Sequence, residues 1–196
     1  MQLEVGSKLF KKELNLITDK SLRNHIINIL DNYVHFDNYL KPSSSTGKYH
    51  PYFDNTDYGN TNHTKAVVKL CKVLLQSRID LQNSIKDIIY ASAILHDMWK
   101  YDGRSSHTCR NHAELAFQFL ESYSLERNLE NDLIGWSLTN IAYIIKYHMG
   151  HWSYENKLDW INEISEDEQL KDAILIVHYA DIICSRKFYN VEDFSL

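Results

Sequence analysis

Apolar residues recur at steps of three and four along most of this chain, and this pattern restricts the fold more than any other property of the sequence. In the stretch 84–99, for example, Ile85, Ile88, Ile89 and Leu95 fall on one side of a helix. The 196 residues include only 2 prolines and 6 glycines, so few points would interrupt such helices. The sequence therefore predicts an all-α protein.

The predicted helices cover most of the chain. They span 20–39, 62–77, 84–99, 111–123, 130–149 and 167–187, with a further short helix expected near the N-terminus. The exception is the stretch 41–62, in which Pro42, Gly47, Pro51 and Gly59 break the helical pattern. Loops of this length inside a compact domain are usually functional or mobile, and we expect the same of this one.

The charge balance bears on the partners of the protein. Its formal net charge is −5 with histidine counted neutral, so the chain has no overall basic character with which to hold a long polyanion. A small phosphorylated substrate fits this balance better, and stable nucleic-acid binding is not expected. No stretch resembles a secretory signal or a membrane span, so no membrane association is expected. The oligomeric state is left open.

The cysteines indicate a reducing compartment. Cys71, Cys109 and Cys184 are odd in number and lack the spacing of a zinc ribbon or a redox pair. Cys71 and Cys184 fall on apolar helix faces, where we expect buried free thiols. These features predict a cytoplasmic location, or the host cytoplasm if the protein is viral.

Histidines and aspartates interrupt the apolar faces of five predicted helices. The residues placed on these faces, or directly beside them, are His63, His96, Asp97, His112, His148 and Asp181. A single histidine in such a place is more often a core residue satisfied by a hydrogen bond. The two carboxylates, Asp97 and Asp181, are harder to explain. Burial of a carboxylate destabilises the fold by several kcal/mol unless the group is paired or bound to a metal.

A divalent cation would account for this pattern. The matching helix faces offer few basic residues to pair with Asp97 and Asp181. Imidazole and carboxylate ligands together suit Zn, Mn, Fe, Co or Ni rather than Ca. Since the candidate ligands come from distant parts of the sequence, the fold itself would assemble the site.

The same residues carry a resemblance to a known family. The run Ile94-Leu95-His96-Asp97-Met98-Trp99-Lys100 resembles the signature of the HD-domain superfamily of metal-dependent phosphohydrolases. That family's ordered pattern is a histidine, an adjacent His-Asp pair and a distant aspartate. The matching residues of this chain are His63, His96, Asp97 and Asp181. His112 and His148 occupy the places of two further histidines with which many members hold a second metal. The resemblance implies a single-domain, HD-type helical bundle around one or two divalent ions (Mn, Fe, Co, Ni, Zn or Mg).

A second segment resembles a narrower group. Residues 45–51, Ser-Thr-Gly-Lys-Tyr-His-Pro, are similar to a run in small HD proteins common in bacteria and their viruses. This chain departs from that group at 60–62, where relatives usually carry a Gly-Leu-like pair, so the local turn is expected to differ. The resemblance predicts an HD domain over 45–187, an N-terminal helical segment over 1–44 packed on its core, and a C-terminal tail over 188–196.

The resemblance also implies an activity, the hydrolysis of a nucleotide or a related small phosphate ester by a metal-activated water. The expected catalytic residues are His96, Asp97 and Lys100, and the expected substrate contacts are His50, Lys100, His151 and Trp152. Lys100 lies one helical turn beyond His96, within reach of a substrate phosphate. Each of these substrate contacts has a non-functional alternative. Lys100 could be a solvated lysine at a helix end, and His50 could lie on the surface. His151 and Trp152 could be core or rim residues. The histidines at 25, 35, 107 and 178 are expected to be structural.

Other activities are compatible with the same scaffold. One is 3′–5′ exonuclease action on single-stranded RNA or DNA, although the related enzymes carry a separate nucleic-acid-binding domain for which this chain has no room. Another is a diiron oxygenase, which the six-residue series permits. An inactive HD domain serving as a binding module would lack some of the ligands, and none is missing here.

Overall fold

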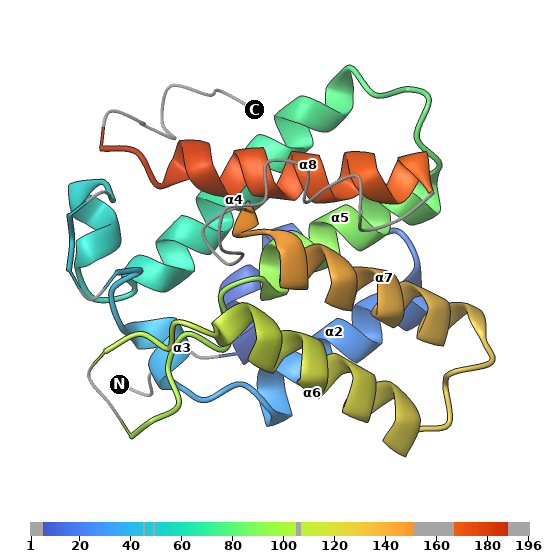
Figure 1. Cartoon of the computed structure of the whole chain (residues 1–196), viewed down its shortest axis with the longest axis horizontal. Helices are drawn as coiled ribbons and strands as arrows, with labels where there is room; N and C mark the ends of the chain where they lie inside the picture. The colour runs from blue at the N-terminus through green and yellow to red at the C-terminus, as the bar shows by residue number, and fades with distance from the viewer. Residues whose placement is uncertain (1–5, 45, 49, 105–106, 151–166, 188–196) are drawn as a thin grey trace.

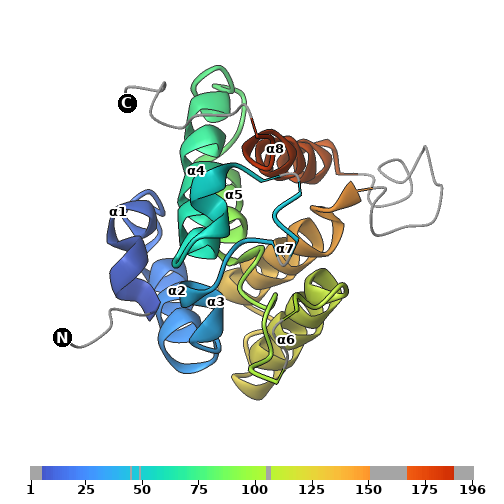
Figure 2. The same ribbon diagram turned by 90° about the vertical axis from the view of Figure 1, so that its left-hand side faces the viewer.

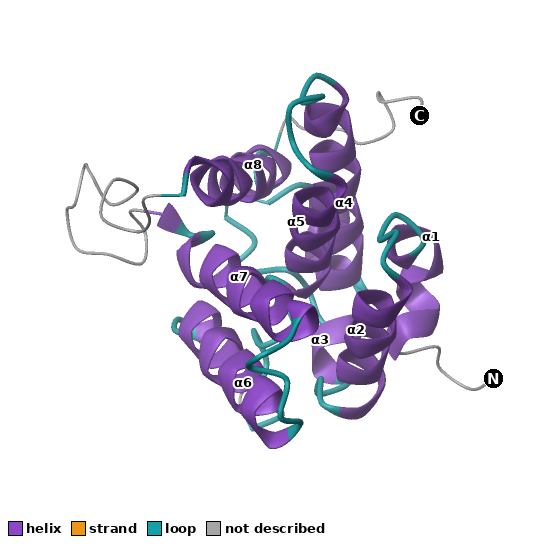
Figure 3. Ribbon diagram, turned by 90° about the vertical axis from the view of Figure 1, so that its right-hand side faces the viewer, coloured by secondary structure: helices purple, strands orange, loops and turns teal. Residues whose placement is uncertain are grey.

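The computed structural model describes residues 6–44, 46–48, 50–104, 107–150 and 167–187, and all regular structure in this part of the chain is helical. The α-helices are α1 (Lys11–Leu14), α2 (Lys20–Asn32), α3 (Asp37–Leu40), α4 (Gly59–Gln76), α5 (Asn83–Leu95), α6 (His112–Glu126), α7 (Leu133–Tyr147) and α8 (Glu168–Cys184). Two 3₁₀ turns, η1 (Gly6–Phe10) and η2 (Tyr52–Asn55), complete the set. The predicted all-α class is confirmed (Figure 3).

Helix α5 forms the centre of the bundle because it is apolar almost all round. It packs against α4, α7 and α8, and α6 packs on the outer side of α7 (Figure 1). The N-terminal elements lie against another side of the bundle, where α1 contacts α4 and α5 while α2 contacts α7 (Figure 2). None of the helices described is long and apolar enough to cross a membrane.

One buried carboxylate ties the N-terminal elements to α5. Asp87 accepts hydrogen bonds from the backbone N–H of Thr18 (2.8 Å), the Thr18 hydroxyl (2.9 Å) and the backbone N–H of Asp19 (2.8 Å). Asp19 in turn caps the N-terminus of α2 by accepting from the N–H of Leu22. The start of α2 is thereby fixed against the central helix. The proposed domain boundary at residue 45 stays a prediction, and the tail 188–196 lies outside the described residues.

The predicted helix 20–39 is wrong in one respect, because the structure divides it into α2 and α3. The helix stops after Asn32, and Tyr33 has φ −126°, outside the helical region. The ring of His35 then accepts a hydrogen bond from the N–H of Asp37, at the start of α3. This local side-chain contact competes with continuation of the helix.

Helix α4 begins earlier than expected, at Gly59. A side chain at this position would place a Cβ 2.0 Å from the carbonyl oxygen of Asp54, so the loop can approach the helix only over a glycine. Tyr58, just before it, adopts the left-handed region with φ 63°. The irregular stretch 41–62 is thereby drawn against the first turns of α4, where His63 lies.

Helix α5 ends earlier than the predicted residue 99. It stops at Leu95, and the following residues form tight turns in which Met98 N–H donates to the Leu95 carbonyl and Lys100 N–H to the Asp97 carbonyl. His96 is therefore the C-cap of α5, as His148 is the C-cap of α7. The polar residues predicted on helix faces thus lie mostly at helix ends.

Candidate metal centre

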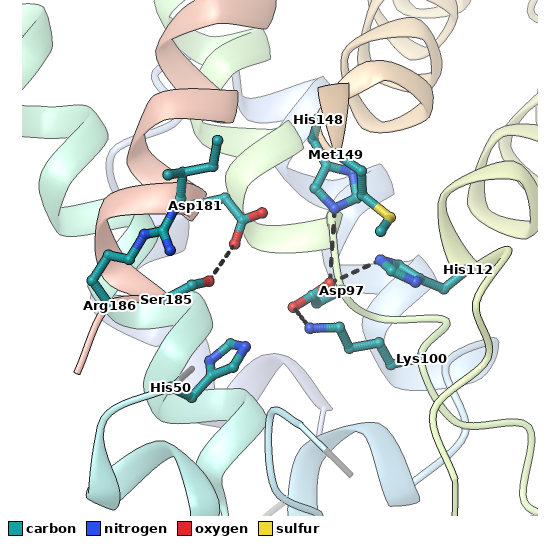
Figure 4. Close-up of a pocket in the computed structure, with 10 residues that line it drawn as sticks. His50, Asp97, Lys100, His112, His148, Met149, Asp181, Ser185 and Arg186 are labelled. Atoms are coloured by element: carbon teal, nitrogen blue, oxygen red, sulfur yellow. Dashed lines mark hydrogen bonds and ion pairs between the residues drawn. The ribbon is translucent and has the colours of Figure 1, made fainter. Parts of the chain in front are cut away.

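Six polar side chains meet where the ends of five helices converge. They are His63 of α4, His96 and Asp97 after α5, His112 at the start of α6, His148 after α7 and Asp181 in the last turns of α8. All of them are buried except Asp181, which is partly exposed. In Figure 4, Asp97 lies between His112, His148 and Lys100, while Asp181 and Ser185 face it across a pocket. The structure therefore brings together all six residues predicted as ligands.

The first group of candidate ligands is His63, His96 and Asp181. One ligand atom from each lies within 4.8 Å of the others. The Nε2 atom of His63 is 2.9 Å from Asp181 Oδ1, and His96 Nε2 is 3.9 Å from the same oxygen. Two imidazoles and one carboxylate pointing at a common position could hold a divalent cation.

The second group is Asp97, His112 and His148, which also meets the 4.8 Å limit. Asp97 Oδ1 lies 3.2 Å from His112 Nε2 and 3.9 Å from His148 Nε2. The other oxygen of Asp97 lies 3.3 Å from His96 Nε2. Asp97 therefore stands between the two groups, with one oxygen directed at each.

Backbone carbonyls fix the orientation of three imidazoles. The Nδ1 atoms of His96, His112 and His148 lie 2.8, 3.0 and 2.6 Å from the carbonyl oxygens of Ala93, Cys109 and Ile145. A carbonyl can only accept, so in each neutral ring the proton is on Nδ1 and the Nε2 lone pair is left free. This is the tautomer that binds a metal through Nε2.

The buried polar atoms of the centre fit a cation. His96 Nε2, Asp97 Oδ1 and His112 Nε2 are shielded from solvent and have no hydrogen-bond partner. Such atoms are rare in native proteins because each carries a desolvation cost. Nitrogen and carboxylate donors together match Mn, Fe, Co, Ni or Zn.

The electrostatics around the carboxylates of the centre also favour positive charge. Burial alone would raise the pKa of Asp97, but the imidazole of His96 and the ammonium of Lys100 hold it well below its usual value. The pKa of Asp181 is lowered in the same way, chiefly by the hydrogen bond from His63. Burial would lower the pKa of His63, yet its hydrogen bond with Asp181 and the nearby carboxylate of Asp54 raise it to about 9.

His148 shows the opposite behaviour. Burial lowers its pKa to about 3, and the neighbouring His96 acts in the same direction. Its ring is therefore neutral at physiological pH, as a metal ligand must be. His148 is thus a neutral nitrogen donor beside the anionic carboxylates of Asp97 and Asp181.

A pocket of about 300 Å³ opens onto this centre. Its lining residues are His50, Asp97, Lys100, His112, His148, Met149, Asp181, Ile182, Ser185 and Arg186. Lys100 forms an ion pair with Asp97 and donates to the Ser43 carbonyl at 3.2 Å. The lysine is therefore held at the wall of the pocket rather than solvated at a helix end.

Of the other predicted substrate contacts, the structure describes only His50. His50 lines the pocket and faces Asp54, with its Nδ1 atom 3.5 Å from Asp54 Oδ2. His151 and Trp152 lie outside the described residues. Of the histidines expected to be structural, His178 contacts the backbone carbonyl of His148 through its Nδ1 atom.

Asp54 and Arg186 are among the residues of the site that sequence reasoning missed. Asp54 lies in an irregular segment, where helical periodicity gives no indication of which side chains point inward. Arg186 follows the end of α8 and lines the pocket five positions after Asp181. Helical spacing does not single it out, because it lies beyond the end of α8 and is not three or four residues from Asp181.

Comparison with known proteins bears on the same residues. The family model for the HD domain matches residues 60–185, which include all six candidate ligands. No match was found among curated proteins, and none among solved structures. The matched range covers more than half of the chain and agrees with the helical fold and the His/Asp clusters. The chain belongs to the HD-domain family and, with it, to the metal-dependent hydrolases.

Proposed function

We propose that this protein hydrolyses a phosphate ester or anhydride bond of a nucleotide or a related small phosphate compound. The observation that carries the proposal is the position of Asp97, which joins two groups of candidate ligands at the base of a pocket walled by two cations, Lys100 and Arg186. The HD-domain match supports the hydrolase class. The phosphate-bearing substrate is inferred from the charge of the pocket.

The proposed ligands divide between two positions. His63, His96, Asp97 and Asp181 would hold one divalent ion, and His112 and His148 would complete a second position with Asp97 as the shared ligand. When bound, such a metal lowers the pKa of a water molecule from about 15.7 towards about 7 and supplies a nucleophile at neutral pH. The protein contributes by fixing the imidazoles through their Nδ1 contacts with backbone carbonyls.

Lys100 is proposed to bind the substrate phosphate. Its ammonium group is held by Asp97 and the Ser43 carbonyl, which leaves one of its three N–H donors for a substrate oxygen. Arg186 lines the same pocket from the end of α8. A guanidinium can form two parallel hydrogen bonds to a phosphate, so the two cations together would orient it over the metal centre.

The size of the pocket favours a small substrate. A volume of about 300 Å³ is at the lower end of the range for small-molecule sites. Met149 and Ile182 add apolar surface to its lining, which suits the uncharged part of a small ester. These features support a nucleotide-sized compound over a long polyanion.

The proposal is tested with a panel of nucleotides in the presence of Mn²⁺ or Co²⁺. We expect release of phosphate or of a nucleoside product, and loss of that release in His96→Ala and Asp97→Ala. Activity that survives both substitutions would contradict the assignment. A labelled oligonucleotide and an oxygen electrode belong in the same experiment, because strand degradation or oxygen consumption would indicate the nuclease or the diiron oxygenase instead.

A further inference from the structure

Asp54 is a buried acid that lies outside the range matched by the family model. It belongs to η2, in the loop before α4, and its side chain is almost completely shielded from solvent. Its backbone is held on both sides, since its carbonyl accepts from Ser43 N–H at 2.7 Å and its N–H donates to the Pro51 carbonyl at 3.1 Å. The close approach of Gly59 fixes this part of the loop on α4. The carboxylate is therefore built into the fold at a defined place.

The side chain of Asp54 faces two histidines. Its Oδ2 atom lies 3.4 Å from His63 Nδ1 and 3.5 Å from His50 Nδ1. Neither carboxylate oxygen has a hydrogen bond of good geometry, although both are buried. A buried carboxylate is destabilising unless nearby donors or cations compensate it. The two imidazoles are the groups that the structure offers for this purpose.

His63 consequently has a carboxylate at each ring nitrogen. Asp54 faces Nδ1, while Asp181 lies 2.9 Å from Nε2 and Asp97 lies 3.7 Å from it. The other three imidazoles of the centre present Nδ1 to a backbone carbonyl and Nε2 to the candidate metal positions. His63 also directs Nε2 at a candidate metal position, but its Nδ1 faces a carboxylate oxygen at 3.4 Å instead of a carbonyl.

We propose that Asp54 is a positioning residue that holds the ring of His63 by its Nδ1–H, so that Nε2 is presented to the metal. The inference rests on the proposed role of His63 as a ligand. A carboxylate is a stronger acceptor than a carbonyl, so Asp54 would make His63 a more basic ligand. It would also hold His50 at the wall of the pocket through the same oxygen.

A third metal between His50, Asp54 and His63 is the competing explanation, because one ligand atom from each lies within 4.8 Å of the others. It would require His63 to lose both ring protons and bind a cation through each nitrogen. The positioning role needs only the neutral tautomer that the other three imidazoles already adopt. The two explanations differ in the number of metal ions bound at saturation.

The test is a calorimetric titration of metal-free protein with Mn²⁺, comparing the wild type with Asp54→Ala and Asp54→Asn. Loss of such an outer partner typically lowers metal affinity about 10- to 100-fold. We expect that loss for Asp54→Ala, and a smaller one for Asp54→Asn because the amide oxygen can still accept from His63. The number of ions bound at saturation should not change. Asp87→Asn is the matched control, since Asp87 is buried but bonds to Thr18 and Asp19 instead of histidines, and its Mn²⁺ affinity should equal that of the wild type.

Each outcome decides a separate point. Wild-type affinity in both Asp54 variants overturns the inference and leaves the proposed function standing. Loss of one bound ion at saturation also overturns it, because Asp54 would then be a ligand. A wild-type protein that takes up no Mn²⁺ overturns the inference and the proposed function together. If Asp54→Ala does not fold, the nearly isosteric Asp54→Asn decides alone, and its affinity must fall below that of the wild type.

Discussion

Two buried aspartates ten positions apart have very different surroundings. Asp87, within α5, accepts three hydrogen bonds of 2.8–2.9 Å from backbone and hydroxyl groups of the N-terminal segment. Asp97, just after the same helix, faces His96, His112 and Lys100, and its Oδ1 has no hydrogen bond of good geometry. Neutral donors satisfy the carboxylate of Asp87, whereas titratable side chains surround that of Asp97.

The difference shows that burial of a charge does not by itself identify a functional site. Two backbone N–H groups and the Thr18 hydroxyl satisfy Asp87, and these hydrogen bonds join the N-terminal segment to α5. Asp97 is left with an unsatisfied oxygen in a cluster of nitrogen donors, which is the condition for binding a cation. The chemical nature of the partners distinguishes the two roles.

The strongest test of this contrast is Asp97→Ala. The substitution removes the carboxylate shared by the two ligand groups, so we expect kcat/KM of the proposed phosphate hydrolysis to fall about 1000-fold. This corresponds to the several kcal/mol of transition-state stabilisation that a bound metal supplies. Steady-state kinetics at saturating Mn²⁺ provide the measurement. A fall of less than tenfold in a folded variant would contradict the role of Asp97 as the ligand shared by both groups.

The converse substitution, Asp87→Asn, should affect stability instead of activity. Replacing the carboxylate weakens three charge-assisted hydrogen bonds and places an amide N–H₂ group against donors, so we expect a loss of about 2–4 kcal/mol in the free energy of unfolding. Urea denaturation measures it. The value of kcat/KM should stay within about twofold of the wild type under conditions where the variant is folded. A large loss of activity would contradict the division of roles.

Metal removal should separate the two regions in a single protein. A cation that binds only the folded state adds about 2.7 kcal/mol of stability at a free concentration 100 times its dissociation constant. We expect this gain in the wild type and in Asp87→Asn, measured by urea denaturation with Mn²⁺ or with a chelator. Asp97→Ala should show much less of it. An equal gain in all three proteins would place the metal elsewhere.

The smallest effect is expected at the wall of the pocket. Arg186→Gln removes one of the two cations proposed to bind the substrate phosphate, so KM should rise about tenfold, as for the loss of one charge-assisted hydrogen bond. The metal affinity should be unchanged, because Arg186 is not among the candidate ligands. Lys187→Gln, which changes an exposed neighbour that does not line the pocket, is the control. Equal KM values for the two variants would exclude Arg186 from substrate binding.

The structure brings the six predicted ligands together, because helical periodicity indicates which side chains point inward. His63, His112 and Asp181 lie on faces whose other members are apolar, and the fold brings those faces together. The predicted helix 84–99 extends past the observed end of α5 at Leu95, yet His96 is buried as its position on the apolar face predicts. Hydrophobic periodicity is a property of many residues together, so an error in the predicted end of a helix does not change which side chains point inward.

Periodicity gives no information where the backbone is irregular. Asp54 was missed because η2 and the loop around it follow no repeat, and its burial depends on the close approach of Gly59. Between α2 and α3 the ring of His35 contacts the N–H of Asp37, a local contact that periodicity does not predict. Asp87 was also overlooked, since the donors that satisfy it come from a distant segment. Contacts of this kind are decided by the tertiary structure.

Anomalous diffraction tests most directly whether histidines and aspartates from five helix ends bind divalent cations at one or both of the two adjacent positions. Data collected at the zinc absorption edge, from crystals grown with Zn²⁺, should show a peak about 2.0–2.1 Å from Nε2 of His96. The carboxylates of Asp97 or Asp181 should lie within coordination distance of the same peak. A map with no peak among these side chains, or with zinc bound only elsewhere, would contradict the account.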